Sequence, residues 1–258
     1  QIADVENSPG SKLMSAEESS LSAPFIDDAP HAQQTNLANT SVSYYPKGEV
    51  VGLVLDLLIR GKTNGKASLD DVMRRMYEEF YLQGPKASYY LRGRGYTGED
   101  FEKIVSQVAR TDMSDFFKRH VRGVEPPPYE EAFAQVGLRF VRTARAPVTI
   151  GITADESDTV NFKIAGLRPD SPAAAAGLQV GDAITSLGGN RFTPANFSKV
   201  LAHYKPGDRV QVSFLRSARA MTAAIILGAP QLFDYRIEEN PNASAEAKAL
   251  RAAWLNGK

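Results

Sequence analysis

An almost unbroken apolar run at residues 50–59 constrains the fold more than any other feature, since only one Gly and one Asp interrupt it. A membrane span needs about twenty apolar residues, so this run is too short to cross a bilayer. It indicates an element that is buried on nearly all sides, and periodicity alone does not separate a helix from a strand. Pro46 suits a first helical turn, and Asp56 and Arg60 are spaced to pair across one turn. These two features favour a helix, and not a strand, at residues 47–60.

The composition excludes several classes of function. The chain has 258 residues with 30 Lys+Arg and 30 Asp+Glu, so no net positive field attracts nucleic acid. It has no cysteine, which excludes disulfides, thiol catalysis and thiolate metal ligands. We find no signal peptide and no membrane span in the sequence. Because the chain begins with Gln1 and not with Met, we expect a processed product that has lost an upstream segment.

The first half carries helix signals after a polar start. Residues 1–43 show no sustained period, which predicts an extended segment with at most a short helical turn at 17–21. Capping boxes at 68–71 and 97–100 each open an amphipathic stretch. We therefore predict about four helices between residues 44 and 122, joined by short connections.

In the second half the hydrophobic period changes to that of strands. A proline-rich stretch at 125–128 stops the helices. Alternating apolar residues then predict short strands, and Ser171-Pro172 and Thr193-Pro194 each predict a helix start. The predicted elements are strands at 148–152, 160–164, 210–214 and 220–227 and helices at 193–204 and 244–255. The predicted fold class is α+β.

Residues 171–184, with the sequence SPAAAAGLQVGDAI, resemble a PDZ domain of the bacterial protease-associated type. The resemblance covers residues 148–228. It implies that a peptide C-terminus adds to a sheet edge while backbone N–H groups capture its carboxylate. The resemblance places this carboxylate loop, and so the peptide-binding residues, at Thr149, Ile150, Gly151 and Ile152. The helix at 193–204 would form the other wall. The loop departs from the GLGF form, and an open groove and a closed one remain equal alternatives.

The first half resembles the glycyl aminopeptidase family of zinc peptidases, whose catalytic domain is thermolysin-like. The matching stretches lie at 43–48, 55–60, 68–73, 115–117, 121–123 and 253–255. In that family a PDZ domain follows the catalytic domain, as it does here. The resemblance implies four parts. They are an extended N-terminal segment at 1–43, a helical C-terminal subdomain of a peptidase domain at 44–137, a PDZ domain at 138–228 and a tail with a short helix at 229–258.

The sequence departs from this family at the metal site. Family members carry His-Glu-x-x-His on a helix, and a catalytic zinc takes three protein ligands and a water. The histidines here are His31, His120 and His203, and no two are spaced i, i+4. We therefore expect no metal ligands in this chain. The resemblance places zinc in the parent enzyme, on a missing N-terminal part.

Tyr45 is the predicted catalytic residue. The Tyr-x-Lys-Gly pattern at 45–48 resembles that of related zinc aminopeptidases, in which this tyrosine donates a hydrogen bond to the tetrahedral oxyanion. The alternative is that Tyr44 and Tyr45 only pack at the start of the apolar helix. Lys47 could face substrate, although a solvated lysine is the commoner case.

Other polar residues are weaker candidates. We interpret the Asp56–Arg60 pair as structural. Arg92 and Arg94 could contact a substrate carboxylate, although a surface loop is the commoner reading. His31 lies in a polar stretch and His120 at a basic helix end, and neither is a good ligand candidate.

Three functions remain open at the level of sequence. The first is a C-terminal fragment of a zinc metallo-aminopeptidase that removes N-terminal Gly or Ala from peptides and is inactive alone. The second is a PDZ module that binds peptide termini, with the helical half as a docking platform. The third is a helical and PDZ structural segment with no separate activity. Family members are often exported, which fits a periplasmic or exported bacterial protein, and the compartment stays open.

Overall fold

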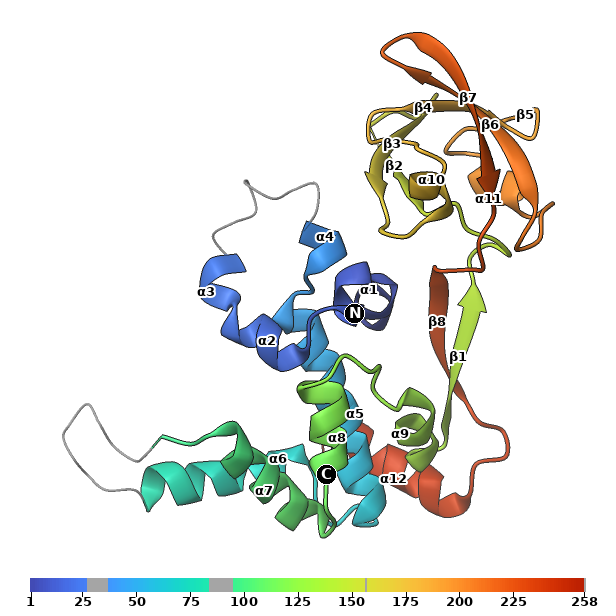
Figure 1. The fold of residues 1–258 in the computed structure, drawn as a ribbon. Helices are drawn as coiled ribbons and strands as arrows, with labels where there is room; N and C mark the ends of the chain where they lie inside the picture. Colours follow the sequence, from blue (N-terminus) through green and yellow to red (C-terminus); the bar gives the residue numbers. More distant parts are fainter. Residues whose placement is uncertain (27–36, 84–94, 156, 258) are drawn as a thin grey trace.

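The computed structural model describes residues 1–26, 37–83, 95–155 and 157–257. These residues form an α+β fold in which a helical half and a β-rich domain are joined by a two-stranded ribbon (Figure 1). Two separate hydrophobic clusters fill the helical half and the β-rich domain. In the described part of the chain, no helix has the length and apolar character needed to cross a membrane.

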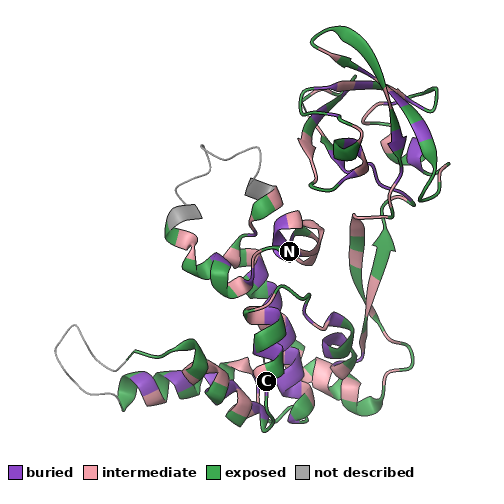
Figure 2. Cartoon of the chain, in the orientation of Figure 1, coloured by how far each residue is buried: buried purple, intermediate pink, exposed green. Residues whose placement is uncertain are grey.

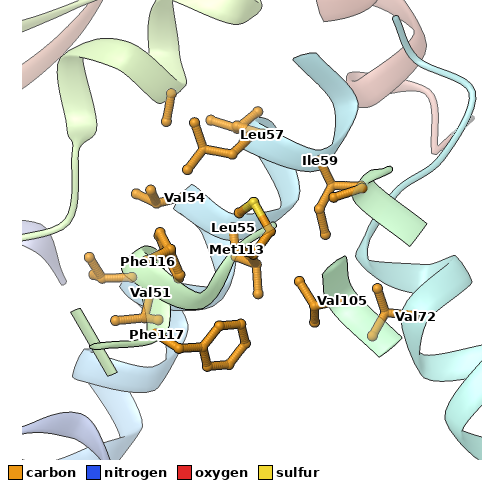
Figure 3. Packing of buried hydrophobic residues seen from close by; sticks show 14 of the residues in the cluster. Val51, Val54, Leu55, Leu57, Ile59, Val72, Val105, Met113, Phe116 and Phe117 are labelled. Atoms are coloured by element: carbon orange, nitrogen blue, oxygen red, sulfur yellow. The ribbon is translucent and has the colours of Figure 1, made fainter. Parts of the chain in front are cut away.

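The helix α5 (Tyr44–Lys62) is the centre of the helical half, as the apolar run predicts. Ser43 begins it by accepting a hydrogen bond from the Tyr45 amide. Val54, Leu57 and Ile59 have no exposed surface. Figure 3 shows their side chains among those of the neighbouring helices, and Figure 2 shows the same burial along the helix. The prediction of a helix buried nearly all round is confirmed.

Short helices surround α5. Their bounds are α6 (Leu69–Met76), the π-helical turn η2 (Tyr77–Leu82), α7 (Gly98–Ala109), α8 (Ser114–Phe116), the π-helical turn η3 (Phe117–Val121) and α9 (Tyr129–Gln135). Both predicted capping boxes are present, at Ser68 and at Thr97. The predicted Asp56–Arg60 pair is also present, at 2.9 Å, and Asp56 accepts a second hydrogen bond of 2.9 Å from the Leu69 amide. This carboxylate therefore ties the start of α6 to α5.

The described part of the N-terminal segment is not extended. It contains α1 (Ile2–Asn7), the 3-10 turn η1 (Pro9–Lys12), α2 (Ala16–Leu21), α3 (Ala23–Ile26) and α4 (Leu37–Thr40). A capping box between Ser15 and Glu18 begins α2, which includes the short turn expected at 17–21. Contacts of α1 and α2 with α5 supply the stability that such short helices lack alone.

A two-stranded antiparallel ribbon connects the two halves. Strand β1 (Leu138–Ala144) pairs with β8 (Phe233–Glu239), with Leu138 opposite Glu239. Phe140 lies between the rings of Tyr129 and Tyr235, with centroid distances of 4.7 and 5.5 Å. The C-terminal helix α12 (Ala245–Leu255) places Leu250 and Trp254 against the helical cluster. The residue limits of the four predicted parts remain predictions. The ribbon contacts the helical half through α9 and α1.

The β-rich domain is a small sheet with two short helices. Its elements are β2 (Ile152–Ala154), β3 (Phe162–Leu167), α10 (Pro172–Ala175), β4 (Ala183–Leu187), β5 (Asn190–Arg191), α11 (Phe197–Leu201), β6 (Arg209–Arg216) and β7 (Arg219–Ile226). The strand order is β2-β3-β4-β6-β7, with β5 paired to β4. Strand β2 therefore lies at an edge of the sheet.

Two predicted elements of this domain are shorter than expected. The strand predicted at 148–152 begins only at Ile152, because Gly151 has a left-handed φ of +73° that ends regular strand geometry. The helix predicted at 193–204 is α11 alone. The Asn196 side chain accepts from the Thr193 amide and donates to the Arg191 carbonyl, so residues 193–196 form a turn before the helix.

Candidate functional site

The predicted carboxylate loop at 149–152 is fixed to the rest of the β-rich domain from several sides. The Thr149 amide donates to the Gly228 carbonyl at 2.9 Å, and the Gly228 amide donates back to Thr149 at 3.0 Å. The Ile150 carbonyl accepts from the Ala173 amide at 3.0 Å. The Ile150 side chain is 1% exposed and lies in the hydrophobic cluster. These contacts make the loop a rigid part of the domain.

Gly151 is the one position of the loop at which only glycine fits. Its φ of +73° disfavours any L side chain. An added Cβ would also come within 2.2 Å of the Ser171 Cβ, at the start of α10. The Gly151 carbonyl accepts from the Arg168 amide at 2.9 Å. The glycine therefore allows β2, β3 and α10 to meet closely behind the loop.

Among the described residues, one edge of strand β2 has no partner strand directly after the loop. In the sheet order it pairs with β3 alone, with Ile152 opposite Leu167 and Thr153 opposite Gly166. The bond from the Arg168 amide to the Gly151 carbonyl marks the preceding pair as hydrogen-bonded. Antiparallel pairs alternate, so the N–H and C=O of Ile152 point away from β3. Such an edge can accept an added strand.

The helix α11 contributes to the same hydrophobic cluster as this loop. Val200 and Leu201 of α11 are buried together with Ile150 and Ile152. The structure thus places the four predicted peptide-binding residues at the start of the edge strand β2 and just before it, and it places Ile150, Ile152 and the shorter helix in one hydrophobic cluster. Their role in binding remains a prediction.

Tyr45 lies at the first turn of α5 with an exposed side chain. It is 67% exposed, and its ring centroid is 4.2 Å from that of Tyr44. In the described residues its hydroxyl takes part in no hydrogen bond, whereas its amide donates to Ser43 Oγ at 3.4 Å. The phenol is therefore available to a ligand, and its backbone is fixed by a long buried helix. Its catalytic role remains a prediction.

Lys47 is buried, against both readings offered by the sequence. It is 5% exposed, and its Nζ donates to the carbonyls of Ser11 at 3.1 Å and Met14 at 2.6 Å. Burial lowers its pKa below the usual lysine range, opposed by the negative charges of Glu6 and Glu18. Lys47 therefore holds the N-terminal segment on α5, two residues after the exposed Tyr45.

Glu6 completes this buried polar group. It accepts a hydrogen bond of 2.7 Å from the Tyr129 hydroxyl. Burial raises the Glu6 pKa above its ordinary value, and it raises that of Tyr129 well above the usual range. A small cavity of about 30 Å³ borders Glu6 and Lys47, which is too small for a substrate. We interpret the group as structural.

The described residues do not fit a zinc ion. No group of three or more His, Asp or Glu side chains among them could hold a metal. His120 is buried, and its Nδ1 lies 3.1 Å from the Glu125 carbonyl, which ties down the proline-rich stretch. His31 lies outside the described residues, as do Arg92 and Arg94, the candidates for a substrate carboxylate.

Arg168 is the residue that the sequence reasoning missed. Its Nη1 donates to the Asn7 carbonyl at 2.8 Å, so it links the β-rich domain to α1. Nearby, Asn39 Nδ2 donates to the Leu167 carbonyl at 2.9 Å. The sequence gives no signal for these bonds, because the partners lie more than a hundred positions apart.

A comparison with family models matches residues 137–227 to the PDZ domain. A search of curated proteins gives no match. Among solved structures, an aminopeptidase N family protein from Idiomarina loihiensis superposes with a TM-score of 0.71 and 24% identity. The superposition covers 96% of this chain but only 42% of that protein.

An HtrA-type protease, AlgW with a decapeptide, matches with a TM-score of 0.30 and 22% identity over 32% of this chain and 29% of its own. The superposition on the Idiomarina protein shows that the fold of the whole chain occurs in an aminopeptidase-like protein. The PDZ match lies in the second half of the chain and includes the loop at 149–152. Residues 137–227 of this chain form a PDZ domain.

Proposed function

We propose that this chain is the C-terminal, PDZ-bearing part of a zinc metallo-aminopeptidase that removes N-terminal Gly or Ala from peptides. The observation that carries the proposal is the superposition on the aminopeptidase N family protein, which runs through both halves of the chain. The chain spans 42% of that protein, so the activity of the whole enzyme is itself part of what we propose.

Tyr45 is the residue of this chain that we assign to the chemistry. Water attack on the scissile carbonyl creates an oxyanion, and the Tyr45 phenol donates a hydrogen bond to it. Three observations support this role. The side chain is 67% exposed, the hydroxyl has no hydrogen-bond partner in the described residues, and the backbone is fixed in α5. A neutral donor held rigidly at the developing charge stabilises the transition state more than the ground state.

The proposal assigns zinc to a segment outside this chain, because the described residues do not fit the ion. The chain alone is therefore expected to bind no stoichiometric zinc and to release no N-terminal residue. Equilibrium dialysis with zinc and a glycyl-p-nitroanilide assay test both expectations. Release of glycine by this chain after zinc addition would overturn the division of the site.

The decisive experiment uses a polypeptide that contains this chain and the zinc-binding segment. Tyr45→Phe should lower kcat by a factor of roughly 10²–10³ with little change in KM, the size typical for loss of one oxyanion donor. Tyr44→Phe is the matched control, because the two rings are in contact and only Tyr45 is assigned a donor role. Equal kcat values for Tyr45→Phe and the wild type would refute the assignment.

We propose peptide binding at the PDZ edge as a second function. The edge of β2 that faces away from β3 favours it, since this edge has no partner among the described residues and a peptide C-terminus can add there as a strand. The test is a titration of the ¹⁵N-labelled chain with decapeptides that end in Ala, Val, Leu or Phe. Shifts of the amides of Ile150, Gly151 and Ile152 are expected. If every peptide leaves these amides unchanged, the PDZ domain has a structural role only.

A further inference from the structure

We propose that Thr149 gates the peptide-binding edge. Its hydroxyl accepts a hydrogen bond from the Gly151 amide, and a ligand carboxylate must displace this hydroxyl. The inference rests on the proposed peptide binding. Peptide capture as proposed above uses only backbone groups of the loop, whereas this inference concerns the side chain of Thr149.

In the free chain, the Thr149 hydroxyl takes the place of the ligand as the hydrogen-bond acceptor of the Gly151 amide. The Gly151 amide donates to Thr149 Oγ1 at 3.1 Å, in a buried position. Thr149 is 8% exposed, and its amide and carbonyl are both bonded to Gly228. The backbone of Thr149 is therefore fixed next to the Gly151 amide, and only a rotation of the Thr149 side chain would release that amide.

This hydrogen bond uses a donor that the proposed ligand needs. Carboxylate capture in a loop of this kind depends on successive backbone N–H groups. Gly151 is the middle residue of the three at 150–152, and its N–H is already satisfied by Thr149. A carboxylate is a stronger acceptor than a neutral hydroxyl, since charge-assisted bonds are roughly twice as strong. The ligand can displace the hydroxyl, but it gains only the difference between the two bonds.

The substitution Thr149→Val isolates this effect. Valine keeps the shape of threonine and removes the acceptor, while the two backbone bonds to Gly228 do not depend on the side chain. Thr149→Ser retains the hydroxyl. The matched control is Thr222→Val on β7, the strand at the opposite end of the sheet order from β2.

The first experiment needs no ligand. Hydrogen exchange of the Gly151 amide, followed by NMR in the free chain, should be faster in Thr149→Val than in the wild type. It should be unchanged in Thr149→Ser and in Thr222→Val. Equal exchange in the wild type and Thr149→Val would show that the hydroxyl does not hold the amide, and the inference would be wrong.

The second experiment measures affinity with fluorescein-labelled decapeptides that end in free Ala, Val, Leu or Phe, and with the same peptides amidated. Thr149→Val should bind the free-acid peptides about fivefold tighter than the wild type, the net value of one hydrogen bond. Thr149→Ser and Thr222→Val should bind as the wild type does. Equal or weaker binding by Thr149→Val overturns the gate. If no peptide binds to any variant, the peptide-binding proposal itself fails, and the gate fails with it for lack of a ligand.

Discussion

Arg168 and Asn7 form the hydrogen bond that joins the PDZ domain to the first helix of the chain, with 2.8 Å between Nη1 and the carbonyl oxygen. The Arg168 amide also donates to the Gly151 carbonyl at 2.9 Å. The Asn7 side chain in turn accepts from the Phe233 amide and donates to the Phe233 carbonyl, both at 2.9 Å. One arginine therefore contacts both the helical half and the proposed ligand loop.

Replacing Arg168 by Ala should loosen the PDZ domain from the helical half. Burial lowers the pKa of the guanidinium, and the carbonyl of Asn7 at the end of α1 compensates in part for the lost water. We expect a loss of about 1–2 kcal/mol in the free energy of unfolding. We also expect a larger radius of gyration in small-angle scattering.

The control for this substitution is Arg209→Ala on β6, where the side chain is exposed. It should leave both the stability and the scattering profile unchanged. If Arg168→Ala scatters as the wild type does, the other contacts are sufficient to fix the domain, and the arginine is dispensable for it.

The Glu6 carboxyl should make stability fall as pH rises above the acid range. Its pKa in the folded chain is raised above the ordinary value of 4.5, mainly by burial, while the Tyr129 hydroxyl and the charges of Lys47, Arg142 and Lys12 oppose the shift. The folded state therefore holds the proton more tightly than the unfolded state. The resulting stabilisation is complete below pH 4.5 and is lost as pH rises through the folded pKa.

Glu6→Gln should remove this part of the pH dependence. Glutamine does not titrate and can still accept the hydrogen bond from Tyr129. Urea unfolding at several pH values between 4.5 and about neutral should give a flatter stability profile than that of the wild type. The control is the exposed Glu17→Gln, which should keep the wild-type slope. A Glu6→Gln profile parallel to the wild type would contradict the raised pKa.

Gly151→Ala should destabilise the PDZ domain more than Gly177→Ala does, although the two substitutions have the same backbone cost. Gly151 and Gly177 have similar left-handed φ values of +73° and +77°. Only at Gly151 would the new Cβ meet another atom, the Ser171 Cβ at 2.2 Å, whereas Gly177 has nothing within 4 Å. Gly177→Ala should lose about 1–2 kcal/mol from the conformation alone.

At Gly151 the steric conflict adds about 1–3 kcal/mol to that loss. Urea denaturation of both variants, followed by circular dichroism, measures the difference. Equal stability of the two variants would show that α10 moves away from the loop at little cost.

Local signals explain the successful predictions. The apolar run at 50–59 predicts α5, and the i, i+4 spacing of Asp56 and Arg60 predicts the ion pair between them. Capping boxes predict the starts of α6 and α7 because caps act within four residues of the chain. The PDZ motif likewise lies within one short stretch, 171–184.

The ribbon between the halves escaped prediction, although a signal for half of it exists. Phe233, Tyr235 and Ile237 alternate with polar residues as a half-buried strand requires. Their partner strand β1 lies about a hundred positions earlier, and neither strand carries a local sequence signal that identifies the other as its partner. The register of Leu138 against Glu239 pairs residues on either side of the whole PDZ domain, so local sequence patterns do not reveal it.

The sequence by itself determined the buried helix, the positions of its caps and the presence of a PDZ domain, because each depends on residues close together in the chain. Only the tertiary structure decided that Lys47 is buried under the N-terminal segment, that Arg168 reaches Asn7, and that Thr149 holds the Gly151 amide within a clamped loop. The physical reason is that burial and hydrogen bonding of a polar group depend on which distant segments pack around it. A residue's own neighbours in the chain do not contain that information.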